Sequence, residues 1–103
     1  MTIQTLNEED FDDFISDGNI IVDFYADWCG PCKIMAPHFE SASKKIKDVK
    51  FAKVDVDANS DLAGRFQVMS IPTTIFFKDG EQVSRHSGAM SERDIIETAE
   101  NDF

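Results

Sequence analysis

This chain of 103 residues has only two cysteines and no long apolar run. A secreted scaffold held together by disulfides needs more cysteines than that. No apolar stretch approaches the ~20 residues of a membrane-spanning helix, so no membrane span is expected. The first ten residues have neither the basic nor the apolar part of a secretory signal. These absences favour a cytoplasmic location.

Basic residues are also scarce. The chain has 10 Lys and Arg against 20 Asp and Glu, which gives a formal net charge of −10 at pH 7. Such an acidic chain argues against nucleic acid or an anionic membrane as a general partner. Docking onto basic patches of protein partners remains compatible with this charge.

Apolar side chains, in contrast, are plentiful enough for one packed core. Hydrophobic residues make up 42% of the chain and include nine phenylalanines. A domain of this length buries about two-thirds of its unfolded surface, and the chain is too short for two ordinary domains. We therefore expect residues 1–103 to form a single domain that functions as a monomer.

The hydrophobic pattern alternates between strands and helices. Strands are predicted at 2–6, 20–26, 51–56, 73–78 and 82–87, with helices between Asn7 and Gly18, from Pro31 to about Lys47, from Asn59 to Phe66 and from Ser91 onward. Strands that alternate with helices predict parallel pairing through right-handed crossovers. The Asp79-Gly80 turn predicts a closing antiparallel hairpin. The expected fold is therefore α/β, a mixed sheet with helices on both faces.

Both cysteines lie in one short run, Trp28-Cys29-Gly30-Pro31-Cys32. The run follows a predicted buried strand and opens a predicted helix. At a helix N-terminus, free N–H groups and the helix dipole stabilise a thiolate, which is the nucleophile of disulfide exchange. A structural zinc site is the alternative. It needs a full set of ligands, and without a second Cys-x-x-Cys pair only His38 and His86 remain as soft candidates.

The two sulfurs are expected to play different roles. Cys29 would stand exposed at the helix start, and Cys32 would lie one turn further in and be shielded. Cys29 would then attack a substrate disulfide, and Cys32 would resolve the mixed disulfide. Two core cysteines without a role are a poorer interpretation, because Gly30-Pro31 between them fits an exposed turn into a helix.

Two further positions are unusual for their predicted strands. Asp23 interrupts the apolar run 20–26, where a buried carboxylate would tend to gain a proton. Near Cys32 it could accept that thiol's proton, directly or through a water. A solvated Asp23 on an edge strand is the alternative. Pro72 leads into the strand 73–78, where proline is normally excluded, and the sequence leaves a trans or a cis bond open.

Together these motifs resemble the thioredoxin family. The resemblance is carried by Val22–Lys33, Pro37, Ala52–Asp55, Ile71–Thr73, Phe77–Gly80 and Gly88, in register along essentially the whole chain. It implies the thioredoxin fold, a central five-stranded mixed sheet flanked by four helices. It also implies a protein-disulfide reductase. A binding module that keeps the fold but does not use its thiols is the rival interpretation.

The resemblance also implies roles for particular residues. Asp23 would be the buried acid and Lys53 its partner on the neighbouring strand. Pro72 would be cis, and the backbone at Ile71 would pair with an extended substrate segment. A shallow substrate-binding groove would be lined by Trp28, Gly30, Pro31, Ile71, Pro72, Gly88 and Ala89.

The resemblance also implies an electron source, and the chain departs from the family pattern at Tyr25 and Ser87. NADPH would supply electrons through a thioredoxin reductase, and the chain would bind no cofactor or metal of its own. Tyr25 stands where many members have tryptophan, so different packing under the dithiol is expected. Ser87, preceded by His86, stands before Gly88 where an apolar residue is frequent, so the groove rim would be more polar.

Overall fold

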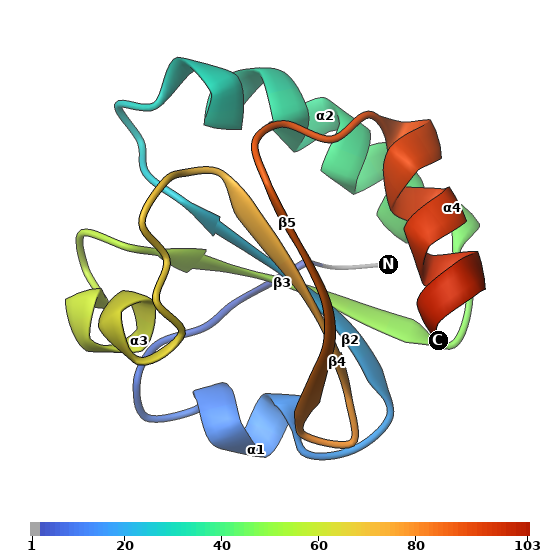
Figure 1. Cartoon of the computed structure of the whole chain (residues 1–103), viewed down its shortest axis with the longest axis horizontal. Coiled ribbons are helices and arrows are strands. Elements are labelled where there is room, and N and C mark those ends of the chain that lie inside the picture. Colours follow the sequence, from blue (N-terminus) through green and yellow to red (C-terminus); the bar gives the residue numbers. More distant parts are fainter. Residues whose placement is uncertain (1–2) are drawn as a thin grey trace.

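The computed structural model describes residues 3–103, and its elements follow the predicted order (Figure 1). Their bounds are β1 Gln4–Thr5, α1 Phe11–Ile15, β2 Asn19–Tyr25, α2 Gly30–Lys45, β3 Val49–Asp55, α3 Ser60–Arg65, β4 Thr73–Lys78, β5 Glu81–Ser87 and α4 Glu92–Asp102. Thr2, the predicted start of the first strand, lies outside the described residues.

The strands form one five-stranded sheet in the order β1-β3-β2-β4-β5. Strands β1 and β2 run parallel to β3, while β4 is antiparallel to β2 and β5 is antiparallel to β4. Helices α1 and α3 lie on one side of the sheet, and α2 and α4 lie on the other (Figure 1). The predicted mixed sheet with helices on both faces is therefore confirmed.

The direction of β4 differs from the expectation that helix-linked strands pair in parallel. Helix α3 has six residues and rises only about 9 Å, whereas the seven residues of β3 span about 23 Å. The chain after α3 also folds back onto it, since the Val68 N–H donates to the Ala63 carbonyl at 2.8 Å. The chain therefore enters β4 from the end of the sheet at which β3 finished, and β4 runs antiparallel to β2.

The central strand β2 separates two hydrophobic cores. Its side chains at Ile20, Val22 and Phe24 belong to the cluster that includes residues of α1 and α3, while Ile21 belongs to the cluster with α2 and α4. Successive side chains of a strand point to opposite faces. Asp23 therefore shares the face of Ile21, and its carboxylate points toward α2, the helix that carries the cysteines.

The sequence also predicts helix caps at Asn7, Asn59 and Ser91, and the structure bears them out to different degrees. The Ser91 side chain forms a capping box with Asp94, which confirms the cap predicted there. The Asn7 side chain accepts the Glu9 and Asp10 N–H groups, but these belong to the turn before α1, whose N-cap residue is Asp10, so the cap predicted at Asn7 is wrong. Asn59 is the N-cap residue of α3, as predicted, but its side chain makes no cap bond. Its amide instead donates to the Asp55 carbonyl in the preceding turn at 3.1 Å.

Candidate active site

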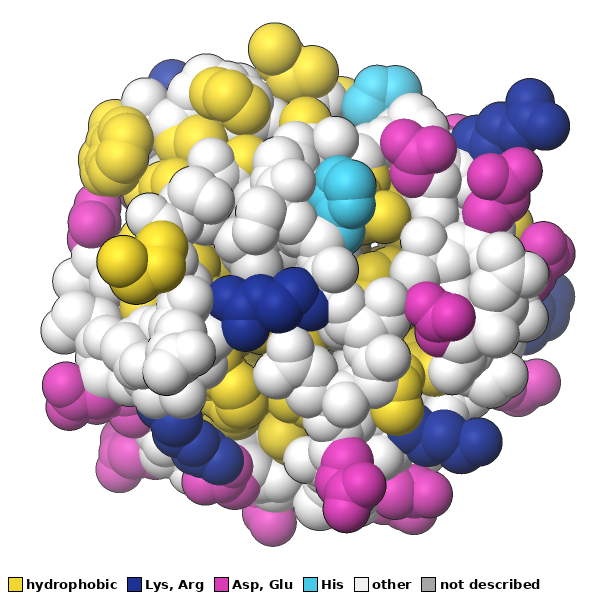
Figure 2. Space-filling view, viewed as in Figure 1, with side chains coloured by type: hydrophobic (Ala, Val, Ile, Leu, Met, Phe, Trp, Pro, Cys, Tyr) yellow, Lys and Arg dark blue, Asp and Glu magenta, His cyan; other side chains and the backbone are white. Residues whose placement is uncertain are grey.

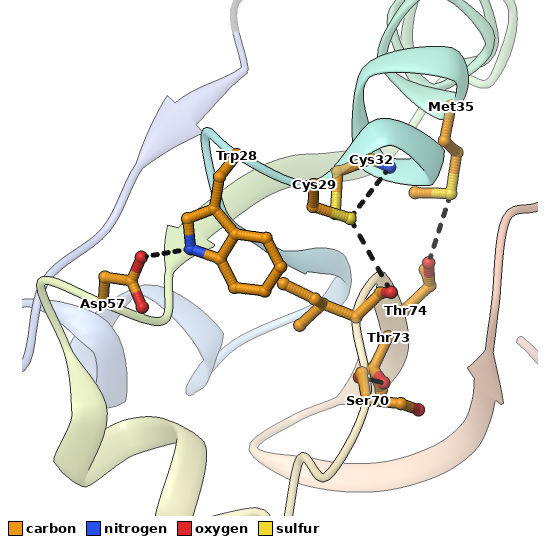
Figure 3. The surroundings of a disulfide bond; sticks show 9 residues. Trp28, Cys29, Cys32, Met35, Asp57, Ser70, Thr73 and Thr74 are labelled. Carbon is orange, nitrogen blue, oxygen red and sulfur yellow. Dashed lines mark hydrogen bonds between the residues drawn. A yellow bond between two sulfur atoms is a disulfide. The ribbon is translucent and has the colours of Figure 1, made fainter.

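Cys29 and Cys32 are joined as a disulfide at the start of α2 (Figure 3). Cys29 is the residue that caps the helix, and its sulfur accepts the Cys32 backbone N–H at 3.2 Å. Pro31 lies in the first turn, where its missing N–H costs no helical bond. The helix therefore begins at the disulfide, and its N-terminal dipole and N–H groups act on the Cys29 sulfur.

The predicted difference in exposure between the two cysteines is wrong for this disulfide form. Both residues are 4% exposed, and they pack in one small cluster with Ala26, Tyr25 and Ile71. Ile71 comes from a distant part of the chain, so the helix start alone does not decide the burial of Cys29. The two sulfurs differ instead in their neighbours: the Cys29 Sγ lies 3.7 Å from the Ile71 carbonyl oxygen.

The Ile71–Pro72 peptide bond is cis, as the resemblance implies. Pro72 is buried, and its carbonyl accepts the Gly88 N–H at 2.8 Å. Gly88 has a φ of 102°, a conformation that residues with a Cβ rarely adopt. The two loops that hold Ile71-Pro72 and Gly88 are therefore joined beside the disulfide.

Exposed apolar side chains gather over the start of α2 (Figure 2). Trp28 and Ile34 are 70% and 67% exposed, and Met69, in the loop before Pro72, is 93% exposed. The Trp28 indole N–H donates to the Asp57 carboxylate at 2.7 Å (Figure 3). Gly30, Pro31 and Ala89, the other residues predicted for the groove, are also exposed.

Asp23 is buried on the central strand, which excludes the solvated edge position. It is 5% exposed, and this burial raises the pKa of its carboxyl to about 7, although the Lys53 charge opposes the rise. Among the described residues, its Oδ1 atom has no hydrogen-bond partner. Lys53 lies opposite Asp23 in the register of β2 and β3. The ion pairs within 4.0 Å found among residues 3–103 do not include these two side chains.

A cavity of about 180 Å³ connects Asp23 with Cys32. It is lined by Asp23, Tyr25, Ala26, Asp27, Cys32, Lys33, Ala36 and Lys53. A cavity of this volume, with charged side chains in its wall, has room for water, which occupies about 30 Å³ per molecule. The structure therefore brings together three of the predicted residues, Asp23, Cys32 and Lys53, around one cavity.

Two residues at the site were missed by the sequence analysis. Asp57 holds the Trp28 indole from 29 positions away. Arg85 donates to the Phe66 and Gln67 carbonyls in the loop before Pro72. Neither residue belongs to a recognisable motif, so only the folded chain brings them to the site.

The sequence raised a zinc site as the alternative for the cysteines, and it predicted no membrane span. Within residues 3–103, no group of three or more His, Cys, Asp or Glu side chains could hold a metal ion. In the same part of the chain, no helix combines the length and apolar character needed to cross a bilayer.

A disulfide at the N-terminus of a helix, held against a cis-proline loop, defines the class of thiol–disulfide oxidoreductases with a thioredoxin fold. The thioredoxin family model matches residues 2–101. The chain therefore belongs to the thioredoxin family. It is a protein-disulfide reductase whose redox-active pair is Cys29 and Cys32.

Individual thioredoxins are similar to this chain over most of their length. Thioredoxin of Staphylococcus saprophyticus is 44% identical over 101 residues, which is 97% of each chain. Thioredoxin of Chlamydia pneumoniae is 42% identical over 86 residues, or 84% of each chain. The crystal structure of Fasciola hepatica thioredoxin superposes with a TM-score of 0.90 at 42% identity, covering 98% of this chain and 100% of that one.

Proposed function

We propose that this chain reduces disulfides of other proteins with Cys29 as the attacking and Cys32 as the resolving residue. In the dithiol form, the Cys29 thiolate attacks one sulfur of the substrate disulfide. The other substrate sulfur leaves as a thiolate and takes up a proton. Cys32 then loses its proton and attacks the Cys29 sulfur, which releases the second substrate thiol. Two electrons and two protons have then passed to the substrate.

The observation that carries this assignment is the Cys32 N–H to Cys29 Sγ contact at 3.2 Å at the start of α2. A donor aimed at the sulfur, together with the helix dipole, lowers the pKa of a thiol and increases its thiolate fraction. Cys32 lies inside the first turn and donates this bond. The contact therefore favours Cys29 as the nucleophile of the first step.

Asp23 is proposed as the group that accepts the Cys32 proton. Its carboxylate and Cys32 both line the cavity of about 180 Å³, so one or more waters can bridge them. A base is most effective when its pKa lies near the working pH, and burial raises the pKa of Asp23 to about 7. Lys53 lines the same cavity, and we propose that its charge limits the rise in pKa.

The substrate is proposed to bind as an extended segment along Ile71. Within residues 3–103, the backbone N–H groups of Met69, Ser70 and Ile71 have no intramolecular partner. Free N–H groups beside the Cys29 sulfur can pair with a substrate backbone as an added strand does. The groove around this segment would comprise Trp28, Gly30, Pro31, Ile71, Pro72, Gly88 and Ala89, and Ser87 would make its rim more polar.

The source of electrons is proposed to be NADPH acting through a thioredoxin reductase. The exchange itself needs only the two thiols, so no cofactor need be held by this chain. We further propose that residues 1–103 act as one domain, as a monomer and in the cytoplasm.

The test is reduction of insulin disulfides by dithiothreitol, or by NADPH and a thioredoxin reductase. Wild-type protein should accelerate the reaction, and Cys29→Ser should abolish the acceleration. Cys32→Ser should form stable mixed disulfides between Cys29 and many different substrate proteins. Wild-type activity no higher than that of Cys29→Ser would overturn the proposal, and a single partner bound independently of the thiols would support the binding-module interpretation.

A further inference from the structure

Arg85 joins the edge strand β5 to the loop that leads into Pro72. Its Nη1 donates to the Phe66 carbonyl at 2.7 Å, and its Nη2 donates to the Gln67 carbonyl at 3.0 Å. Hydrogen bonds from a charged donor are stronger than neutral ones, and the planar guanidinium can reach two acceptors at once. Residues 66–72, called here the proline loop, are therefore held at their start by one side chain.

The carbonyls that Arg85 binds are left free by the way α3 ends. Gln67 has a φ of 54°, and the Gln67 and Val68 N–H groups turn back to the Gly64 and Ala63 carbonyls. This Schellman ending satisfies carbonyls within α3. The Phe66 and Gln67 carbonyls lie beyond those paired in this way and take an outside donor. Arg65 does not donate to them, because its guanidinium makes two bonds to the Asp12 carboxylate.

The other end of the proline loop is held independently. The Thr73 hydroxyl donates to the Ser70 carbonyl at 2.6 Å, and the Gly88 N–H donates to the Pro72 carbonyl at 2.8 Å. Between the two ends, Met69 is 93% exposed, and in the described part of the chain no intramolecular acceptor meets its N–H or that of Ile71. The loop thus combines two fixed ends with a middle whose hydrogen-bonding groups remain open.

We propose that Arg85 is a positioning residue for substrate docking, which keeps the Ile71 backbone beside Cys29 through its two bonds to the proline loop. The proposal rests on the docking mode proposed above. When only part of a population is competent to bind, the apparent affinity falls by that fraction. Releasing the loop should therefore weaken the docking of an extended protein substrate. It should leave the chemistry at the Cys29 sulfur unchanged.

The experiment compares Arg85→Ala and Arg85→Lys with Arg93→Ala. Arg93 is an exposed arginine of α4 that forms a surface ion pair with Glu97, so it controls for the loss of one surface charge. Each variant is assayed with insulin, which can pair with the loop, and with 5,5′-dithiobis(2-nitrobenzoate), which has no peptide backbone. Dithiothreitol is the reductant in the insulin assay, and the previously reduced protein, freed of dithiothreitol, supplies the two electrons in the assay of the small disulfide.

Arg85→Ala should raise the KM for insulin about fivefold, the loss expected for a net hydrogen-bond contribution of this kind. Its kcat and its rate with the small disulfide should stay within about twofold of wild type. Arg85→Lys keeps the charge but not the planar guanidinium, so its KM for insulin should lie between that of wild type and that of Arg85→Ala. Arg93→Ala should match wild type. An unchanged KM, or an equal loss on both disulfides, would overturn the proposal.

Amide hydrogen exchange provides a readout that does not depend on activity. In Arg85→Ala, the hydrogen-bonded amides of Gln67 and Val68, at the start of the proline loop, should exchange faster, while those of β2 should not change. If wild-type protein failed to reduce insulin, the proposed function would be wrong. Amide exchange alone would then test whether Arg85 holds the proline loop in place. If Arg85→Ala failed to fold, the same measurements on Arg85→Lys would decide, and wild-type exchange and KM in that variant would contradict the role.

Discussion

Lys53 places its ammonium group over the ring of Tyr25, 5.3 Å from the ring centroid, although its Cα is paired across the sheet with that of Asp23. A cation over an aromatic face is attracted by the ring quadrupole. Lys53 therefore acts on Asp23 from a distance, and its charge lowers the pKa of Asp23 less than burial raises it. Tyr25, a departure from the tryptophan frequent in the family, still provides the aromatic face that this arrangement needs.

Removing the Lys53 charge should raise the pKa of Asp23 further. In Lys53→Met the opposing charge is lost while most of the apolar stem is kept. Asp23 should then titrate above about pH 7, and resolution of the mixed disulfide near neutral pH should slow. Titration of the Asp23 carboxyl carbon by NMR measures the first effect, and Lys53→Arg is the control that keeps the charge. A pKa that falls or stays constant in Lys53→Met would contradict this account.

The buried Asp23 should also make stability depend on pH. Its pKa is about 7 in the folded chain and 3.8 as the reference value, so between these values the folded state binds more protons than the unfolded state. Stability then falls as pH rises from about 4 to about 7. The shift corresponds to about 4 kcal/mol at most.

Urea unfolding of the oxidised protein at pH 4.5 and pH 8 checks this dependence. Asp23→Asn cannot ionise, so the stability of the variant relative to wild type should rise by several kcal/mol, of order 2–4, between about pH 4.5 and pH 8. Other carboxylates titrate in both proteins and cancel in the difference. A difference that is the same at both pH values would exclude a raised pKa at this position.

The parts of the fold and of the site that could be predicted from the sequence are those determined by a local sequence pattern. The dithiol, the capping box at Ser91 and the Asp79-Gly80 turn each depend on neighbouring residues. The burial of Cys29 depends instead on Ile71, which is 42 positions away, and the Trp28 indole depends on Asp57. Such contacts follow from how the loops pack around the end of the sheet, and periodicity carries no information about them. The direction of β4 was missed for a similar reason, because it depends on the path of the chain after α3.

Gln67 should be a site where glycine stabilises the protein. Its φ of 54° costs a residue with a Cβ about 1 kcal/mol, and glycine adopts this conformation freely. Part of the gain is lost because glycine is more flexible in the unfolded chain. Gln67→Gly should therefore raise the free energy of unfolding by about 0.5 kcal/mol, whereas Gln67→Ala, which keeps the strain, should not. Urea unfolding of both variants measures the difference, and equal effects of the two would show that strain is not the cause.

Asp57 should control the orientation of the one tryptophan in the chain. The Trp28 ring is 70% exposed, and its indole N–H is held by the Asp57 carboxylate at 2.7 Å. Because Trp28 is the single tryptophan, fluorescence reports on this ring alone. Asp57→Ala should increase the mobility of the ring, seen as faster anisotropy decay.

The same variant should raise the KM for insulin a few-fold, about the effect of losing one hydrogen bond to a charged acceptor. Asp61→Ala is the matched control. It removes a nearby exposed acid of α3, whose side chain makes no hydrogen bond in residues 3–103, and it should change neither the anisotropy nor the KM. If Asp57→Ala left the anisotropy decay unchanged, the carboxylate would not be what holds the indole. If both variants raised KM equally, the loss of negative charge would explain the effect better than the loss of this bond.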